Sequence, residues 1–370
     1  MERWVPWRAA VAVSLIVLAG AGAATAASPS GARRPPFPAR TITLHGPVGA
    51  KGGPLGALAL DGPFAVYVLG NKDGRGCQLG ESVYRLDLAT GRSRVVSGHF
   101  TCSEPQTSTG AGIETVAAAG ARTAWLLNEG GNTESDDILF ASTATAGKEK
   151  VLARASRTGA APPATTGTWI GGLVADGTRI SYATWTTTGT QAVRTSALWR
   201  VSGGGAHVLA RGSGAVVSAS AEAGRVALLR SDGTVAVYGL NGPLLQTISV
   251  GPAHAVALDG DAVAVLTKAR TVEVYDRLTG ALRHTWPIAS GPGPQFAASG
   301  DVAVYVTWRS IHAVNLLTGR DAVVATAKRA IDHADLDRAG LLYDYNLTWT
   351  ANAGRIVFTP FTRIAAAVGE

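Results

Sequence analysis

The chain has 370 residues, a formal net charge of +7, and 46% hydrophobic against 16% charged residues. This hydrophobic content excludes an intrinsically disordered chain. The basic residues form no stripe with interleaved aromatic residues, so we expect no nucleic-acid partner. The 46 glycines and 17 prolines are spread through the chain, which is typical of many short strands joined by tight turns.

Residues 1–27 have the pattern of an export signal. Arg3 and Arg8 precede an apolar run over residues 9–24, and residues 24–26, Ala-Thr-Ala, match a cleavage site. We therefore expect a secreted or extracytoplasmic protein of the cell envelope. The alternative is that the segment stays uncleaved and anchors the protein in the membrane. Residues 28–40 are rich in Pro and Arg and predict a flexible linker to a domain over residues 41–370.

After a lone strand predicted at Thr41–His45, the chain repeats one pattern, in which a turn ending in Gly separates two short strands. The turns are Asp61-Gly62, Ala119-Gly120, Asp176-Gly177, Ala223-Gly224, Asp259-Gly260, Ser299-Gly300 and Ala339-Gly340. The clearest repeat is residues 255–288, which predicts strands at Ala255–Leu258, Ala262–Thr267, Thr271–Asp276 and Ala281–Ile288. Four antiparallel strands in about 40 residues are typical of one blade of a β-propeller.

The sequence therefore predicts an all-β fold, a seven-bladed β-propeller of four-stranded antiparallel blades. The last repeat is one strand short, since only a short tail follows Gly354–Phe361. We expect Thr41–His45 to complete this blade and close the ring, because that pairing removes two exposed strand edges.

A second turn recurs as Asp87–Gly91, Asp276–Gly280 and Asn315–Gly319, with the pattern Asp/Asn-x-x-Thr-Gly. It resembles the repeats of bacterial YVTN-type and quinoprotein-like (PQQ-like) propellers over about residues 41–366. The Trp-Asp repeats of WD40-like scaffolds match less well, since no repeat ends in Trp-Asp. The quinoprotein resemblance implies a Trp after each turn Gly, and only Trp286 follows one. We therefore expect no quinone and no other cofactor.

Cys77 and Cys102 fall in two loops on one face of the first predicted blade. In an exported protein a disulfide between them is expected. It would close a loop of about 25 residues and stabilise the fold by about 3 kcal/mol.

A binding site is predicted where the innermost strands begin, because these positions converge on the mouth of a propeller's central channel. Polar and aromatic side chains gathered there suit a small molecule or a peptide end, although every channel mouth has a lining. The candidates are Glu114, Trp169, His254, Gln295, Phe296 and His333. Trp185, Trp308 and Arg309 are predicted nearby as rim contacts for a partner.

Two acidic segments are weak candidates for metal binding, and we expect no metal at either. Glu134 and Asp136 lie in an oxygen-rich loop whose spacing does not match the alternating calcium-binding loop. Asp335 and Asp337 follow His333 at every second residue, which is too linear for a compact site on one strand.

No nucleophile elbow, phosphate loop or dinucleotide fingerprint occurs in the sequence. We predict a monomeric, non-enzymatic binding or scaffolding module for a protein or small ligand outside the cytoplasmic membrane. The first alternative is a metal-assisted lactonase- or lyase-like enzyme that uses Glu114, His254 and His333 at the channel mouth. The second is an assembly partner of a membrane protein.

Overall fold

The computed structural model describes most of the chain from Phe37 to its end. The described residues are 37–46, 54–71, 80–97, 110–130, 134–142, 148–158, 165–189, 193–202, 205–239, 241–288, 293–347 and 353–370. They belong to one compact unit that begins at Pro36. The predicted export signal and both cysteines, Cys77 and Cys102, lie outside the described residues. In the described part, no helix is long and apolar enough to cross a membrane.

The described strands form antiparallel sheets that follow the order of the chain. The first sheet has β2 (Leu55–Asp61), β3 (Phe64–Asn71), β4 (Gly80–Asp87) and β5 (Ser93–Val95). The next has β6 (Gly110–Ala119), β7 (Arg122–Gly130), β8 (Glu134–Ser142), β9 (Lys150–Thr158), β10 (Thr166–Asp176), β11 (Arg179–Thr187), β12 (Val193–Ser202) and β13 (Gly205–Gly212). This eight-stranded sheet consists of two groups of four, since β9 and β10 pair only at Thr158–Thr166 and Arg157–Gly167.

Four four-stranded groups make up the rest of the unit. The first three are β14 (Val216–Glu222), β15 (Arg225–Arg230), β16 (Thr234–Tyr238), β17 (Leu244–Ser249); β18 (Ala253–Asp259), β19 (Ala262–Thr267), β20 (Thr271–Asp276), β21 (Leu282–Pro287); and β22 (Phe296–Ser299), β23 (Val302–Thr307), β24 (Ser310–Asn315), β25 (Asp321–Thr326). The last group has β26 (His333–Leu336), β27 (Gly340–Asn346), β28 (Ala353–Pro360) and, from the start of the unit, β1 (Arg40–His45).

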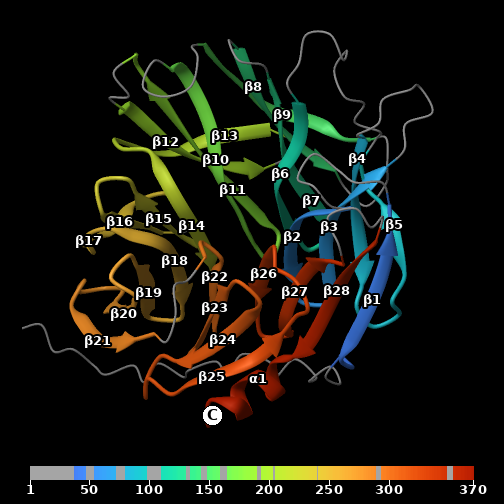
Figure 1. Cartoon of the computed structure of the whole chain (residues 1–370). Helices are drawn as coiled ribbons and strands as arrows, with labels where there is room; N and C mark the ends of the chain where they lie inside the picture. The colour runs from blue at the N-terminus through green and yellow to red at the C-terminus, as the bar shows by residue number, and fades with distance from the viewer. Residues whose placement is uncertain are drawn as a thin grey trace, which may run out of the picture. The chain divides into compact units, whose positions relative to one another are not determined.

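The sheets are arranged radially, with the first strand of each group innermost (Figure 1). Each innermost strand contacts the next, in the order β2, β6, β10, β14, β18, β22 and β26, and β26 contacts β2. A radial set of antiparallel sheets is the architecture of a β-propeller, as the repeats predict.

The cores lie between successive sheets, and β19 shows how the sequence builds them. Val263 and Val265 pack with residues of the preceding sheet, whereas Ala264 and Leu266 pack with residues of the following sheet. Strands buried on both faces need apolar residues at every position, which explains why the run Ala262–Leu266 does not alternate with polar residues.

The elements predicted for residues 255–288 match β18 to β21 within two residues at each end. Six of the seven turn glycines adopt the left-handed conformation that their position requires, and Gly260 has a φ of 58°. The exception is Gly340, which is the first residue of β27. The N-terminal strand β1 pairs antiparallel with β28 from Arg40–Phe358 to His45–Ala353. The sequence predicted this pairing of the first strand with the last repeat.

One element was not predicted: the helix α1 (Phe361–Ala367), in a segment interpreted from the sequence as a short tail. Ile364 on the helix and Val368 after it pack in the core with Val302 and Leu341. The helix is too short to have an amphipathic period of its own, so the sequence alone gave no sign of it.

Candidate functional site

A cavity lies along the axis on which the innermost strands converge. We call the end where these strands begin the loop end, and the end where they finish the turn end. The loop end has a volume of about 360 Å³ and the turn end about 650 Å³, and the two share lining residues including Leu58, Thr115 and Leu173. The cavity therefore continues along the innermost strands and has two chemically distinct ends.

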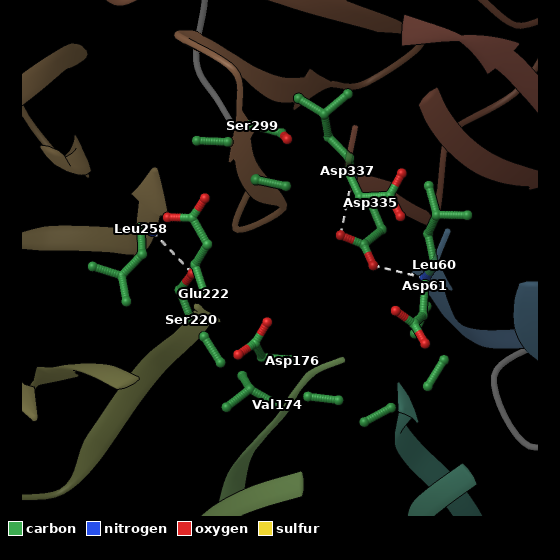
Figure 2. Close-up of a pocket in the computed structure, with 18 of the residues that line it drawn as sticks. Leu60, Asp61, Val174, Asp176, Ser220, Glu222, Leu258, Ser299, Asp335 and Asp337 are labelled. Atoms are coloured by element: carbon green, nitrogen blue, oxygen red, sulfur yellow. Dashed lines mark hydrogen bonds between the residues drawn. The ribbon is translucent and has the colours of Figure 1, made fainter. Parts of the chain in front are cut away.

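The turn end is acidic. Carboxylates from four innermost strands and from the turn after one of them line it (Figure 2). Arg338 is the one basic residue among the described lining residues. The carboxylates are Asp61, Asp176, Glu222, Asp335 and Asp337.

Carboxylates at the turn end bind the backbone of the neighbouring sheet. Four of them, together with Asp259 at the end of β18, accept a hydrogen bond from an amide at the first turn of the next group. We call this arrangement the carboxylate latch. The pairs are Asp61 with Gly120, Asp176 with Gly224, Glu222 with Gly260, Asp259 with Gly300 and Asp301, and Asp337 with Gly62. The equivalent positions Ala119 and Ser299 carry no carboxylate. These acidic residues therefore have a structural role, because each one joins its own strands to the next group by a hydrogen bond.

The weak metal candidates fall into two places. Asp335 accepts a hydrogen bond from the amide of Leu60 at 2.8 Å, and Asp337 accepts one from Gly62 at 2.6 Å. Glu134 and Asp136 are exposed on β8. Among the described residues, no group of three or more His, Cys, Asp or Glu side chains has a geometry that could hold a metal ion.

Burial raises the pKa of several acidic side chains at or near the turn end. It raises the pKa of Asp335 to about 6, against the lowering effect of the Leu60 amide, and the carboxylates of Asp337 and Asp61 raise it further. Burial likewise raises the pKa of Asp61, Asp259 and Asp337, although each accepts backbone amides that lower it. The hydrogen bonds of the latch therefore form although burial destabilises the charged form of these carboxylates.

Asp259 offers a test of the latch, because its two oxygens accept amides from Gly300 at 3.0 Å and Asp301 at 2.5 Å. We expect Asp259→Ala to lower the free energy of unfolding by about 1–3 kcal/mol, since two partly buried amides lose their acceptor. Asp259→Asn should cost less than half as much, because it keeps one acceptor oxygen and removes the desolvated charge. Urea denaturation at pH 7 measures both; equal losses for Ala and Asn would contradict this account.

The loop end brings together three of the six predicted mouth residues. Glu114 from β6, Gln295 just before β22 and His333 from β26 line it. They come from three different sheets, so only the side-by-side arrangement of the innermost strands brings them around one cavity. The Gln295 side-chain amide donates to the carbonyl oxygen of Asp332 at 2.8 Å, which orients one side of this mouth.

His333 is held by a buried carboxylate on the next strand. Its Nδ1 lies 3.2 Å from both oxygens of Asp344, whose side chain is fully buried on β27. Asp344 also accepts the backbone amide of His333 at 2.9 Å. A buried carboxylate against Nδ1 fixes the orientation of an imidazole, which is the geometry of an oriented general base or of a firmly placed binding group.

Asp332 and Asn346 complete this network, and sequence reasoning assigned a role to neither of them nor to Asp344. The Asn346 side-chain amide donates to Asp332 at 2.9 Å, and its oxygen accepts the amide of Leu55 at 3.1 Å. Burial and the Asp344 carboxylate raise the pKa of Asp332, opposed by His333 and Asn346. Asp344 and Asn346 sit at alternate positions of β27, a spacing that points two polar side chains to one face.

Trp169 and Trp185 lie opposite one another on β10 and β11, and their rings stack with centroids 6.2 Å apart. The Arg157 guanidinium lies 3.9 Å from the Trp169 ring centroid and forms an ion pair with Asp137 at 2.7 Å. Neither Trp lines the cavity described above. The structure thus places this predicted pair together, beside the cavity rather than in it.

The remaining predicted residues are spread over the unit. Phe296 lines the turn end, and His254 on β18 lines neither end of the cavity. Trp308 and Arg309 form the exposed turn between β23 and β24. Ligand contact at all of these positions stays a prediction.

No family model matches the chain, and no curated protein matches it. Among solved structures, the crystal structure of the WD40 β-propeller domain of Doa1 is similar, with a TM-score of 0.55 over 88% of this chain and 97% of that chain. The two are 13% identical, and 1042 solved chains match, so the likeness carries information about architecture and none about ligands. It does not decide between the repeat families that the sequence resembles. The comparison and the sheet order together show a β-propeller fold.

Proposed function

We propose that this protein is a non-enzymatic binding module that works outside the cytoplasmic membrane. The observation that carries the proposal is the loop end of the cavity, where Glu114, Gln295 and His333 from three sheets surround one opening. Propellers commonly serve as rigid platforms for binding, and the loops at one end of such a platform supply its recognition residues. The chemistry of this opening, one carboxylate, one amide and one imidazole, suits a polar small ligand or a peptide end.

The finer architecture belongs to the same proposal. We take the eight-stranded sheet as two blades, because its halves pair at only two residue positions, which makes seven blades of four strands. We take the pairing of β1 with β28 as the closure of the ring. The protein is proposed to be an exported monomer of the YVTN or quinoprotein-like type.

Native mass spectrometry of the protein isolated from its own cell envelope tests the binding proposal. We expect a bound mass that is lost in Glu114→Gln/His333→Gln and retained in the matched variant Asp232→Asn/Arg92→Gln, whose exposed residues lie away from the cavity. A bound mass that survives loss of both mouth residues would place the ligand elsewhere. A bare chain from the envelope, with no adduct on cross-linking, would contradict the proposal.

A second candidate function is supported by the His333–Asp344 pair, which has the geometry of an oriented general base beside Glu114. It is a lactonase- or lyase-like enzyme acting at the loop end. Turnover of a panel of chromogenic lactones, abolished in His333→Ala, would favour it over the binding module. Asp344→Asn should then lower kcat and shift the pH profile, because the imidazole loses its orienting carboxylate. Absence of turnover above the His333→Ala level supports the binding module.

A further inference from the structure

Four residues, Trp308, Arg309, Lys328 and Arg329, lie together on the face that carries the loop end; we call them the basic corner. Trp308 and Arg309 form the turn between β23 and β24, and the other two lie in the segment that joins β25 to β26. Backbone hydrogen bonds hold the two segments together: Ala327 donates to the carbonyl of Arg309 at 2.8 Å, and Ile331 donates to that of Trp308 at 3.0 Å. The corner is therefore a defined part of the fold.

The corner combines an exposed aromatic ring with unopposed positive charge. Trp308 is 67% exposed, the highest value among the large hydrophobic residues described. Arg309, Lys328 and Arg329 are exposed, and within the described ranges none of them forms an ion pair. Arg283, on β21, shows the contrast: its guanidinium is paired with Asp261 at 2.8 Å and also with Asp276.

The shape of the corner favours a flat partner. Trp308 stands on a two-residue turn, so it projects from the surface, and the corner residues do not line the described cavity. A ligand held in a groove would need concave walls with converging polar groups. A projecting Trp among cations instead matches the interface of an anionic bilayer, where indole rings lie at the headgroup level and each Lys or Arg raises the binding constant about fivefold.

We propose that the basic corner binds the surface of an anionic lipid membrane. The turn between β19 and β20 carries Lys268 and Arg270, which are exposed, and strand order places this turn on the same face of the neighbouring sheet. Lys268 and Arg270 therefore add positive charge to the same face, on the sheet that precedes the one carrying Trp308 and Arg309. Membrane contact through this face would bring the opening formed by Glu114 and His333 toward the lipid. The inference rests on the corner alone and stands whether or not the cavity binds a ligand.

Co-sedimentation of the full chain with phosphatidylcholine vesicles, with and without phosphatidylglycerol, tests the proposal. The N-terminal segment contributes equally to every variant, so the comparison is between variants on anionic vesicles. We expect Arg309→Gln/Arg329→Gln to weaken binding about tenfold to thirtyfold, from two lost cations. Arg92→Gln/Arg94→Gln removes the same charge from the exposed edge of the first sheet and should change binding less than threefold, about 0.6 kcal/mol.

The aromatic contribution is measured separately. Trp308→Ala should weaken binding to anionic vesicles. Leu317→Ala, at another exposed apolar position (56% against 67%) at the opposite end of the same sheet, should not. Brominated lipids should quench part of the wild-type tryptophan fluorescence, and this part should vanish in Trp308→Phe. Equal binding by the corner variants and their controls would overturn the proposal. So would a soluble polyanion such as dextran sulfate that binds the corner while vesicles do not.

Discussion

Asp137→Ala is expected to lower the free energy of unfolding by about 3–5 kcal/mol, the cost of leaving a buried charge without its partner. The Asp137 side chain, 3% exposed, pairs with Arg157 at 2.7 Å. It also accepts hydrogen bonds from the Asn128 side chain at 2.8 Å and from the backbone amide of Ile170 at 3.0 Å. Removing the carboxylate leaves the guanidinium without its counter-charge and two donors without their acceptor, one of them on the first strand of the next group.

The neighbouring residue supplies a matched control. Asp136 lies on the same strand with its side chain exposed, so Asp136→Ala should change stability by no more than about 0.5 kcal/mol. Guanidinium denaturation followed by tryptophan fluorescence measures both variants. A loss for Asp137→Ala no larger than that for Asp136→Ala would show that the ion pair is dispensable.

A companion variant separates the charge from the packing and remains informative if Asp137→Ala does not fold. In Asp137→Leu/Arg157→Met the unpaired guanidinium is gone, and apolar side chains fill the space. This double variant should be more stable than Asp137→Ala, because breaking a buried pair costs more than replacing it. The amide of Ile170 still lacks its acceptor there, so recovery should be incomplete.

Asp335 is expected to make the protein less stable as the pH rises from about 4 to about 6. Burial raises its pKa from 3.8 to about 6, so the folded state holds the proton more tightly than the unfolded state does. The stability from this group is therefore fully present below pH 4 and is lost as the pH rises through 6. A pKa shift of this size corresponds to about 3 kcal/mol in the free energy of unfolding. Because the Asp335 carboxyl faces the cavity, solvent screening reduces the expected loss to about 1–3 kcal/mol.

Asp335→Asn tests this by removing the charge while keeping an oxygen for the Leu60 amide. We expect the variant to be more stable than the wild type at pH 7. Its free energy of unfolding should also decrease much less than that of the wild type between pH 4 and pH 6. Asp61, Asp259, Asp332 and Asp337 have pKa values raised in the same direction, so part of the slope should remain. Urea midpoints at pH 4, 5, 6 and 7 measure both chains. Parallel pH curves for wild type and variant would contradict the assignment to Asp335.

The acidic residues at the turn end show which features the local sequence predicts and which it does not. Asp61, Asp176 and Asp259 stand immediately before a turn Gly, so the sequence marks them as turn residues. Their partners are amides 41 to 59 residues further along the chain, in the next group of strands. Sequence spacing carries no information about such contacts, which exist only once the innermost strands stand side by side.

The candidate site divides in the same way. Gln295 and His333 were predictable because they stand at the start of an innermost strand, and all such starts meet at one end of a propeller. Glu114 was predicted on the same ground; it lies in the middle of β6 and still lines the loop end. Trp169 and His254 were predicted on the same ground and lie outside the cavity lining. The Trp169 ring instead stacks on Trp185 of the next strand, a contact that sequence spacing does not reveal. Asp344 was missed because its partner His333 lies across a strand pair.

The sequence by itself determined the strands, their turns and the neighbour of the N-terminal strand, because these depend on local periodicity, on glycine at left-handed positions and on the pairing of exposed edges. The tertiary structure alone decided the carboxylate latch, the Asp137 and His333 networks, the C-terminal helix and the basic corner. Each of these depends on side chains or backbone groups brought together from separate strands and loops, and their energies come from burial that exists only in the assembled sheets.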